Sequence, residues 1–135
     1  MITKVIEFDG VNLVVPIIDG YPLFMPYPSL DEFASYCGPG SGVGDWLVPE
    51  TLSGLRVSAA CYIHDMMWAY AEPTWGEFHY SNSVFVRNLI EIVLVKTPDE
   101  DDVQAKRLSE ALIYYMAVDK GFKIFWKLKR EQQFI

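Results

Sequence analysis

The chain has 135 residues, of which 51% are hydrophobic and 21% are charged, so it is large and apolar enough to bury one core. We therefore expect a single domain over residues 1–135. Its formal net charge of −7 argues against nucleic acid as a partner, because phosphate binding requires a basic face. Its two cysteines are too few for a disulfide framework, but they suffice for one bridge in an oxidising compartment.

The first residues lack the apolar stretch of a secretory signal. The most apolar segment, 89–95, is interrupted by Glu91 and is too short to span a bilayer. We therefore expect cytoplasmic synthesis of a soluble protein without a signal peptide.

The N-terminal segment predicts a β-hairpin. Residues 3–8 and 11–17 are rich in β-branched and aromatic side chains, and Asp9-Gly10 lies between them. Asp-Gly is a strong signal for a two-residue hairpin turn. We expect these two strands to pair with each other.

The following segment, 18–30, contains three prolines and a glycine, which disfavour regular structure. It also carries large apolar side chains, including Tyr21 and Phe24. Two interpretations are open: an extended arm packed over the core, or the rim of a site for an apolar ligand. After it, Ser29 and the acidic residues up to Phe33 predict a helical turn.

A helix is predicted from a cap at Thr51 or Ser53 to about Glu72. Its apolar stripe has helical spacing, with Asp65 on the flank. The stripe consists of Val57, Cys61, His64 and Trp68. Because His64 can take a proton near neutral pH and Asp65 can bind a hard cation, this helix carries the candidate chemistry.

Residues 73–80 are expected to form a loop in which His79 is a surface residue. Ser81 or Asn82 is then expected to cap a second helix that ends near Lys96. The predicted buried face of this helix consists of Val84, Phe85, Leu89, Ile92 and Val93.

A third helix is predicted from Thr97-Pro98 to about Asp119, since a cap, a proline and acidic residues typify a helix start. Its predicted inward face consists of Leu108, Leu112, Ile113, Tyr115 and Met116. Gly121 precedes a tail, 122–127, that is either a short amphipathic helix or a continuation of the third helix. The sequence thus predicts a mainly α fold with a small N-terminal β-hairpin.

Two motifs resemble those of the secreted phospholipase A2 superfamily. Residues 36–40, Tyr-Cys-Gly-Pro-Gly, are similar to its Y-C-G-x-G calcium loop, and residues 61–65 are similar to its C-x-x-H-D helix motif. The resemblance covers mainly residues 36–85. It implies a helical core in which two packed helices carry the His-Asp site, with a further C-terminal helix. It also implies a disulfide between Cys37 and Cys61.

This resemblance implies a calcium-dependent hydrolase that cleaves the sn-2 ester of a glycerophospholipid. The carbonyls of Tyr36, Gly38 and Gly40 and the carboxylate of Asp65 would hold Ca²⁺. His64 would act as general base on the attacking water. The implied partner is a phospholipid or a membrane surface.

The chain departs from the family pattern at two places that imply weak activity. Trp68 stands where the family usually has Tyr, and Asn82 stands where it has the Asp that orients the histidine. We expect Asn82 to accept a hydrogen bond from His64 and from the indole N–H of Trp68. We also expect His64 to face a substrate-binding groove lined by Trp68, Tyr21 and Phe24.

A second resemblance is to a family of small uncharacterised phage and prophage proteins. It consists of the Ala-Ala-x-x-x-His-Asp run at 59–65, Asn82-x-x-Phe85, and Tyr-Met-Ala-Val at 115–118. It implies no established activity and suggests a phage or prophage source. On this interpretation the protein is a non-catalytic structural or interaction module that is associated with the virion and has phage or host proteins as partners. Two function classes are therefore open: a calcium-dependent lipid esterase, and a module that keeps the His-Asp helix as scaffold.

Overall fold

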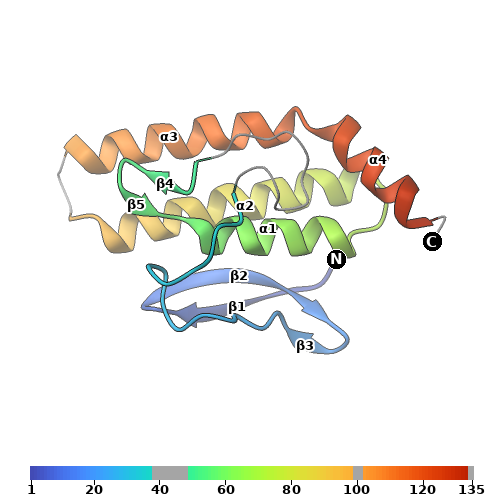
Figure 1. Ribbon diagram of the computed structural model, residues 1–135, viewed down its shortest axis with the longest axis horizontal. Helices are drawn as coiled ribbons and strands as arrows, with labels where there is room; N and C mark the ends of the chain where they lie inside the picture. The colour runs from blue at the N-terminus through green and yellow to red at the C-terminus, as the bar shows by residue number, and fades with distance from the viewer. Residues whose placement is uncertain (38–48, 99–101, 134–135) are drawn as a thin grey trace.

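The computed structural model describes residues 1–37, 49–98 and 102–133. These residues form a mainly α protein with a small N-terminal antiparallel sheet. The sheet lies along one side of α1 and α2, and α3 packs on α2 on the side away from the sheet (Figure 1). The elements are β1 (Thr3–Phe8), β2 (Val11–Ile18), β3 (Tyr21–Pro22), β4 (Thr51–Leu52), β5 (Leu55–Arg56), α1 (Ser58–Tyr70), α2 (Trp75–Lys96), α3 (Asp102–Asp119) and α4 (Phe122–Gln133).

The predicted hairpin is confirmed, and a second one follows it. Asp9 and Gly10 have φ values of 51° and 79°, the left-handed conformation that a tight turn between β1 and β2 requires. Asp19 and Gly20 repeat this turn, with φ values of 52° and 84°, and join β2 to the short β3. The start of the segment expected to be irregular is therefore a strand, because the same Asp-Gly signal occurs twice.

The sheet is attached to the helices through β2. Its inward side chains, Val11, Leu13 and Val15, are completely buried. Asn88 of α2 accepts a hydrogen bond from the backbone N–H of Val14 and donates one to its carbonyl, both at 2.9 Å. A buried asparagine thus satisfies both backbone groups of a strand residue, as a neighbouring strand would.

The arm that follows β3 packs over the core, as one of the two interpretations predicted. Leu23, Leu30 and Phe33 are buried. The residues around Leu30 form bends and a short turn, where a helical turn was expected. The backbone N–H of Leu30 donates to the carboxylate of Asp9 at 3.0 Å, so the turn is fixed to the first hairpin.

Helix α1 begins later than predicted. The segment expected to form its first turns is the β4–β5 hairpin, in which Ser53 and Gly54 have φ values of 45° and 85°. Arg107 of α3 donates to the carbonyls of Leu52 and Ser53 at 3.0 and 2.9 Å. These long-range bonds hold the hairpin, and α1 starts only at Ser58. The predicted buried stripe of α1 is confirmed.

Helix α2 begins earlier than predicted. Thr74 is its N-cap, and its side chain accepts a hydrogen bond from the backbone N–H of Glu77 at 3.1 Å. The expected loop at 73–80 is therefore mostly the first two turns of α2, and His79 lies on a helix. The sequence does contain a signal for this helix start, because a threonine three residues before a glutamate is typical of a capping box. The predicted end and buried face of α2 are confirmed.

Helix α3 ends at Asp119 as predicted, but its inward face was predicted only in part: Leu108 is partly buried and packs against the core. Ala111 and Val118 are its buried residues. Three of the residues expected to point inward are more than half exposed: Leu112, Ile113 and Met116. Ala111 lies on the buried side although its side chain is small, whereas the prediction assigned only large side chains to that side.

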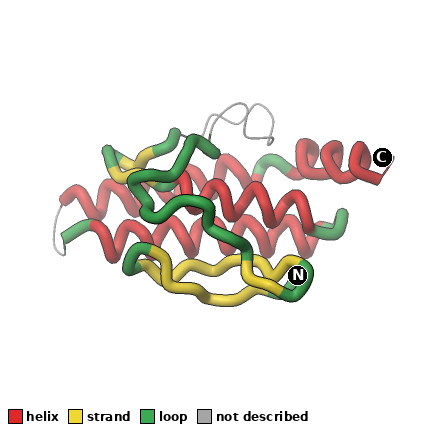
Figure 2. Tube along the Cα trace, turned by 60° about the horizontal axis from the view of Figure 1, so that its bottom comes forward, coloured by secondary structure: helices red, strands yellow, loops and turns green. Residues whose placement is uncertain are grey.

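The tail forms a separate helix, α4, which packs against the end of the core. Phe125 is fully buried, and its ring centroid lies 5.5 Å from that of Trp68 and 5.3 Å from that of Phe78. Lys129 donates to the carbonyl of Ala69 near the end of α1 at 2.9 Å. Figure 2 shows α4 beyond the end of the helical layer. None of the described helices meets the length and apolarity that crossing a membrane requires.

Candidate functional site

A disulfide joins Cys37, the second residue of the predicted calcium loop, to α1. Cys37 and Cys61 are bonded, with an S–S distance of 2.04 Å and a Cα–Cα distance of 5.1 Å. This is the pairing that the resemblance implied. Cys61 lies one turn before Asp65, so the bridge places Cys37 beside the candidate chemistry.

Glu50 holds the other end of the same loop to α1. Its carboxylate accepts a hydrogen bond from the backbone N–H of Cys37 at 2.8 Å and another from the hydroxyl of Ser58. Its carbonyl accepts from the backbone N–H of Val57 at 2.9 Å. Glu50 therefore fixes Cys37 at the start of α1. No local pattern in the sequence selects Glu50, because its role depends on contacts across the chain.

Gly38 and Gly40, expected to offer carbonyls to a cation, lie outside the described residues. Tyr36, the third such residue, packs its ring 4.9 Å from that of Tyr62 on α1. Burial raises the pKa of Tyr36, and the charges of Tyr27 and Asp65 raise it further. Asp65 is thus close enough to Tyr36 for its charge to act on the Tyr36 hydroxyl.

Asp65 has the properties of a carboxylate that lacks a counter-charge. Its Oδ2 atom is buried and has no hydrogen-bond partner in the described part of the chain. Burial raises the pKa of Asp65 to about 8, and the neighbouring charge of Glu50 adds to the effect. A divalent cation would stabilise the ionised forms of Asp65 and Glu50. Among such cations, Ca²⁺ prefers oxygen ligands. The described residues contain no group of three or more His, Cys, Asp or Glu side chains that could hold a metal.

His64 is buried in the core, although we expected it to face a groove. It is 3% exposed, and its ring lies between those of Trp68 and Phe85, at centroid distances of 4.7 and 4.8 Å. Burial lowers the pKa of His64 to about 4, although its hydrogen bond to Asn82 acts in the opposite direction. The imidazole is therefore neutral at pH 7.

Asn82 is the partner that the sequence predicted. Its Oδ1 lies 2.8 Å from Nε2 of His64, and Nε1 of Trp68 donates to the same oxygen at 3.3 Å. Because an indole N–H can only donate, the atom facing it must be the amide oxygen. That oxygen can only accept, so Nε2 of His64 carries the ring proton and Nδ1 keeps its lone pair.

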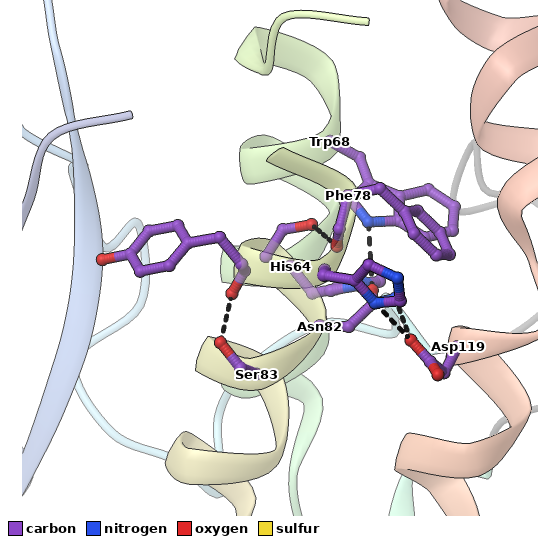
Figure 3. A network of polar contacts seen from close by, with 9 residues as sticks. His64, Trp68, Phe78, Asn82, Ser83 and Asp119 are labelled. Carbon is purple, nitrogen blue, oxygen red and sulfur yellow. Dashed lines mark hydrogen bonds and ion pairs between the residues drawn. The ribbon is translucent and has the colours of Figure 1, made fainter. Parts of the chain in front are cut away.

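A carboxylate from α3 completes the network. Nδ2 of Asn82 donates to Oδ1 of Asp119 at 3.4 Å, and Nδ1 of His79 lies 3.1 Å from the same oxygen. Figure 3 shows His64 and Trp68 of α1 and Asp119 of α3 around Asn82 of α2. Asp119 was not among the predicted site residues, and His79 was expected in a surface loop. Only the contact between α2 and α3 reveals them.

The three predicted substrate-binding residues lie in different environments. Trp68 is fully buried against Phe78 and Phe125, and it serves as a hydrogen-bond donor to Asn82. Tyr21 and Phe24 are 76% and 77% exposed on the arm. The arm does approach α1, because the hydroxyl of Tyr62 donates to the carbonyl of Phe24 at 2.8 Å.

No protein-family model, no curated protein and no solved structure matches this chain. Its function must therefore be argued from the chemistry of the site itself. The structure brings together an anchored neutral histidine, a carboxylate whose buried Oδ2 atom has no hydrogen-bond partner among the described residues, and a disulfide one turn away.

Proposed function

We propose that the protein is a calcium-dependent, phospholipase A2-like hydrolase of glycerophospholipids with low activity. The observation that carries the proposal is the orientation of His64. Its Nε2 is anchored by Asn82, and the adjacent residue on α1, Asp65, has a buried Oδ2 atom without a hydrogen-bond partner in the described part of the chain. An oriented base next to a site for a hard cation is the pairing that this chemistry needs.

In this proposal Nδ1 of His64 is the proton acceptor. It has a lone pair, because the ring proton is on Nε2, and no described residue forms a hydrogen bond with it. Asn82 is itself held by Trp68, so the ring cannot easily rotate. The lone pair is thus available to a water molecule that enters the site.

The chain's own groups then account for the proton transfers. Nδ1 of His64 takes a proton from water as the water oxygen bonds to the carbonyl carbon of the sn-2 ester. When the tetrahedral intermediate collapses, the bond between that carbon and the glycerol oxygen breaks. His64 returns its proton to the glycerol oxygen, and the products are a fatty acid and a lysophospholipid.

The donor set fits calcium. Asp65 would supply the charged ligand, and the carbonyls of Tyr36, Gly38 and Gly40 would supply neutral ones. The buried Oδ2 of Asp65 without a partner supports this assignment, and so does the pKa of Asp65 near 8. When bound, the cation supplies electrophilic stabilisation of the ester carbonyl and of the oxyanion. We expect weak binding, because only one of these ligands carries charge.

The proposed activity is low for two physical reasons. A histidine with a pKa near 4 is a weak base at neutral pH. Asn82 orients the ring but carries no charge, so it stabilises an imidazolium less than a carboxylate does.

The proposal is tested with phospholipid vesicles in calcium or in EDTA, by measuring released fatty acid. We expect slow release in calcium only, and none from Asp65→Asn. Glu32→Gln is the matched control, because Glu32 is an exposed carboxylate on the arm. Equal release in calcium and EDTA would contradict the calcium requirement.

A second candidate is a non-catalytic phage or prophage module that keeps the His-Asp helix as scaffold. The observation that favours it is the burial of His64, which is 3% exposed and neutral at pH 7. A core histidine bonded to a buried amide serves folding as well as catalysis. This candidate predicts no fatty acid release under any condition, together with loss of stability in His64→Leu.

A further inference from the structure

We propose that Asp119 is a positioning residue for His64, and that it supplies through Asn82 the negative charge that the His64–Asn82 pair lacks. This inference rests on the proposed function, because it concerns the strength of the same base. The residue lies on α3, at the far end of the chain from the two motifs that indicated the site.

The geometry forms a continuous path from the carboxylate to the imidazole. Oδ1 of Asp119 accepts from Nδ2 of Asn82 at 3.4 Å, and Oδ1 of Asn82 accepts from Nε2 of His64 at 2.8 Å. The two ends of one amide group therefore face the carboxylate and the ring. Asn82 and His64 are buried, so water is excluded from the contact between them, whereas the contact with Asp119 is only partly buried.

An amide in this position is polarised by the carboxylate. Donation from Nδ2 to a carboxylate shifts electron density toward Oδ1, because hydrogen bonds in a chain polarise one another in a medium of low dielectric constant. Oδ1 then becomes a stronger acceptor for Nε2–H. The consequence is a ring that is held more firmly and an imidazolium that is stabilised during proton transfer.

His79 orients the carboxylate. Its Nδ1 lies 3.1 Å from Oδ1 of Asp119, and its ring packs edge-on against Trp75 at a centroid distance of 4.5 Å. The side chains of Asp119 and His79 are 34% and 40% exposed, so solvent screens part of their charge. The effect of Asp119 on His64 should therefore be moderate.

The test compares Asp119→Asn with Glu110→Gln. The first substitution keeps an acceptor oxygen for Asn82 and removes the charge. The second removes a carboxylate from the same helix, where Glu110 accepts from the hydroxyl of Ser53 at 2.6 Å and does not contact Asn82. The readouts are the Nε2–H resonance of His64 by NMR at pH 7 in EDTA, and the kinetics of phospholipid hydrolysis in calcium. Backbone amide spectra verify the fold of both variants.

We expect the Nε2–H resonance to move upfield in Asp119→Asn and to stay in place in Glu110→Gln. We expect kcat to fall about 10-fold in Asp119→Asn with KM unchanged, because Asp119 acts through other residues. An unchanged Nε2–H resonance in Asp119→Asn would overturn the inference even if the wild type hydrolyses lipid. A shifted resonance in a protein without hydrolysis supports the coupling and contradicts only the proposed function.

Discussion

Nε2 of His64 lies 2.8 Å from the amide oxygen of Asn82, and this buried contact joins α1 to α2. The amide fixes which ring nitrogen carries the proton, and it does so without a charge of its own. The His64 ring is therefore held in one orientation, but its lowered pKa makes it a weak base.

Replacing Asn82 by Asp should raise the pKa of His64 by at least about one unit, because an adjacent carboxylate favours the imidazolium. Calcium-dependent hydrolysis should increase with it. NMR titration of His64 is the measurement, and Asn12→Asp, at an exposed position of β2, is the control. An unchanged titration would show that the two residues are not partners in solution.

Replacing Trp68 by Phe should reduce the free energy of unfolding by about 1–3 kcal/mol, since a buried hydrogen bond and packing volume are both lost. Urea denaturation measures this change. Trp126→Phe is the matched control, because Trp126 is a half-exposed tryptophan on α4. Equal stabilities for the two variants would contradict the role of Trp68 in holding Asn82.

The calcium-free protein should lose stability as pH rises from 6.5 to 8. The folded-state pKa of Asp65 is about 8 against an ordinary value of 3.8, so its stabilising effect is complete below 3.8 and is lost as pH rises through 8. The pKa of His64 is lowered from 6.5 to about 4, so its contribution is constant above pH 6.5. The slope should be at most about 1.4 kcal/mol per pH unit.

Urea denaturation at several pH values in EDTA measures this dependence, and Asp65→Asn should remove it. Calcium should also remove it, because a bound cation favours the ionised carboxylate. A slope that persists unchanged in Asp65→Asn would show that another group causes it.

Replacing Cys37 and Cys61 together by Ser should lower the free energy of unfolding by about 3 kcal/mol, given a sequence separation of 24 residues. It should also weaken calcium binding, because Cys37 belongs to the predicted calcium loop. Calorimetry of calcium binding in both proteins tests the second point. The same calcium affinity in both would mean that the bridge serves folding alone.

Local signals in the sequence predicted the elements that depend on local physics. Asp9-Gly10 set the first hairpin, and the spacing of Val57 to Trp68 set the buried stripe of α1. The partnership of His64 with Asn82 was also predictable, because it followed from the resemblance and from the donors and acceptors available to each side chain.

Features that depend on contacts between distant segments were missed. The start of α2 was also misplaced, although Thr74 and Glu77 carry a local capping signal. Asp119 reaches Asn82 only because α3 packs on α2, and no local pattern encodes that alignment. Glu50 likewise approaches Asp65 only after the chain has folded.

The most direct test of the central claim is mass spectrometry of the products from a phospholipid with different acyl chains at its two positions. We predict that the wild type in calcium releases only the sn-2 fatty acid, and that His64→Gln releases none. Glu32→Gln, at an exposed position of the arm, is the control and should retain the sn-2 product. Release by His64→Gln at the wild-type rate, or no release by the wild type in calcium, would contradict the account.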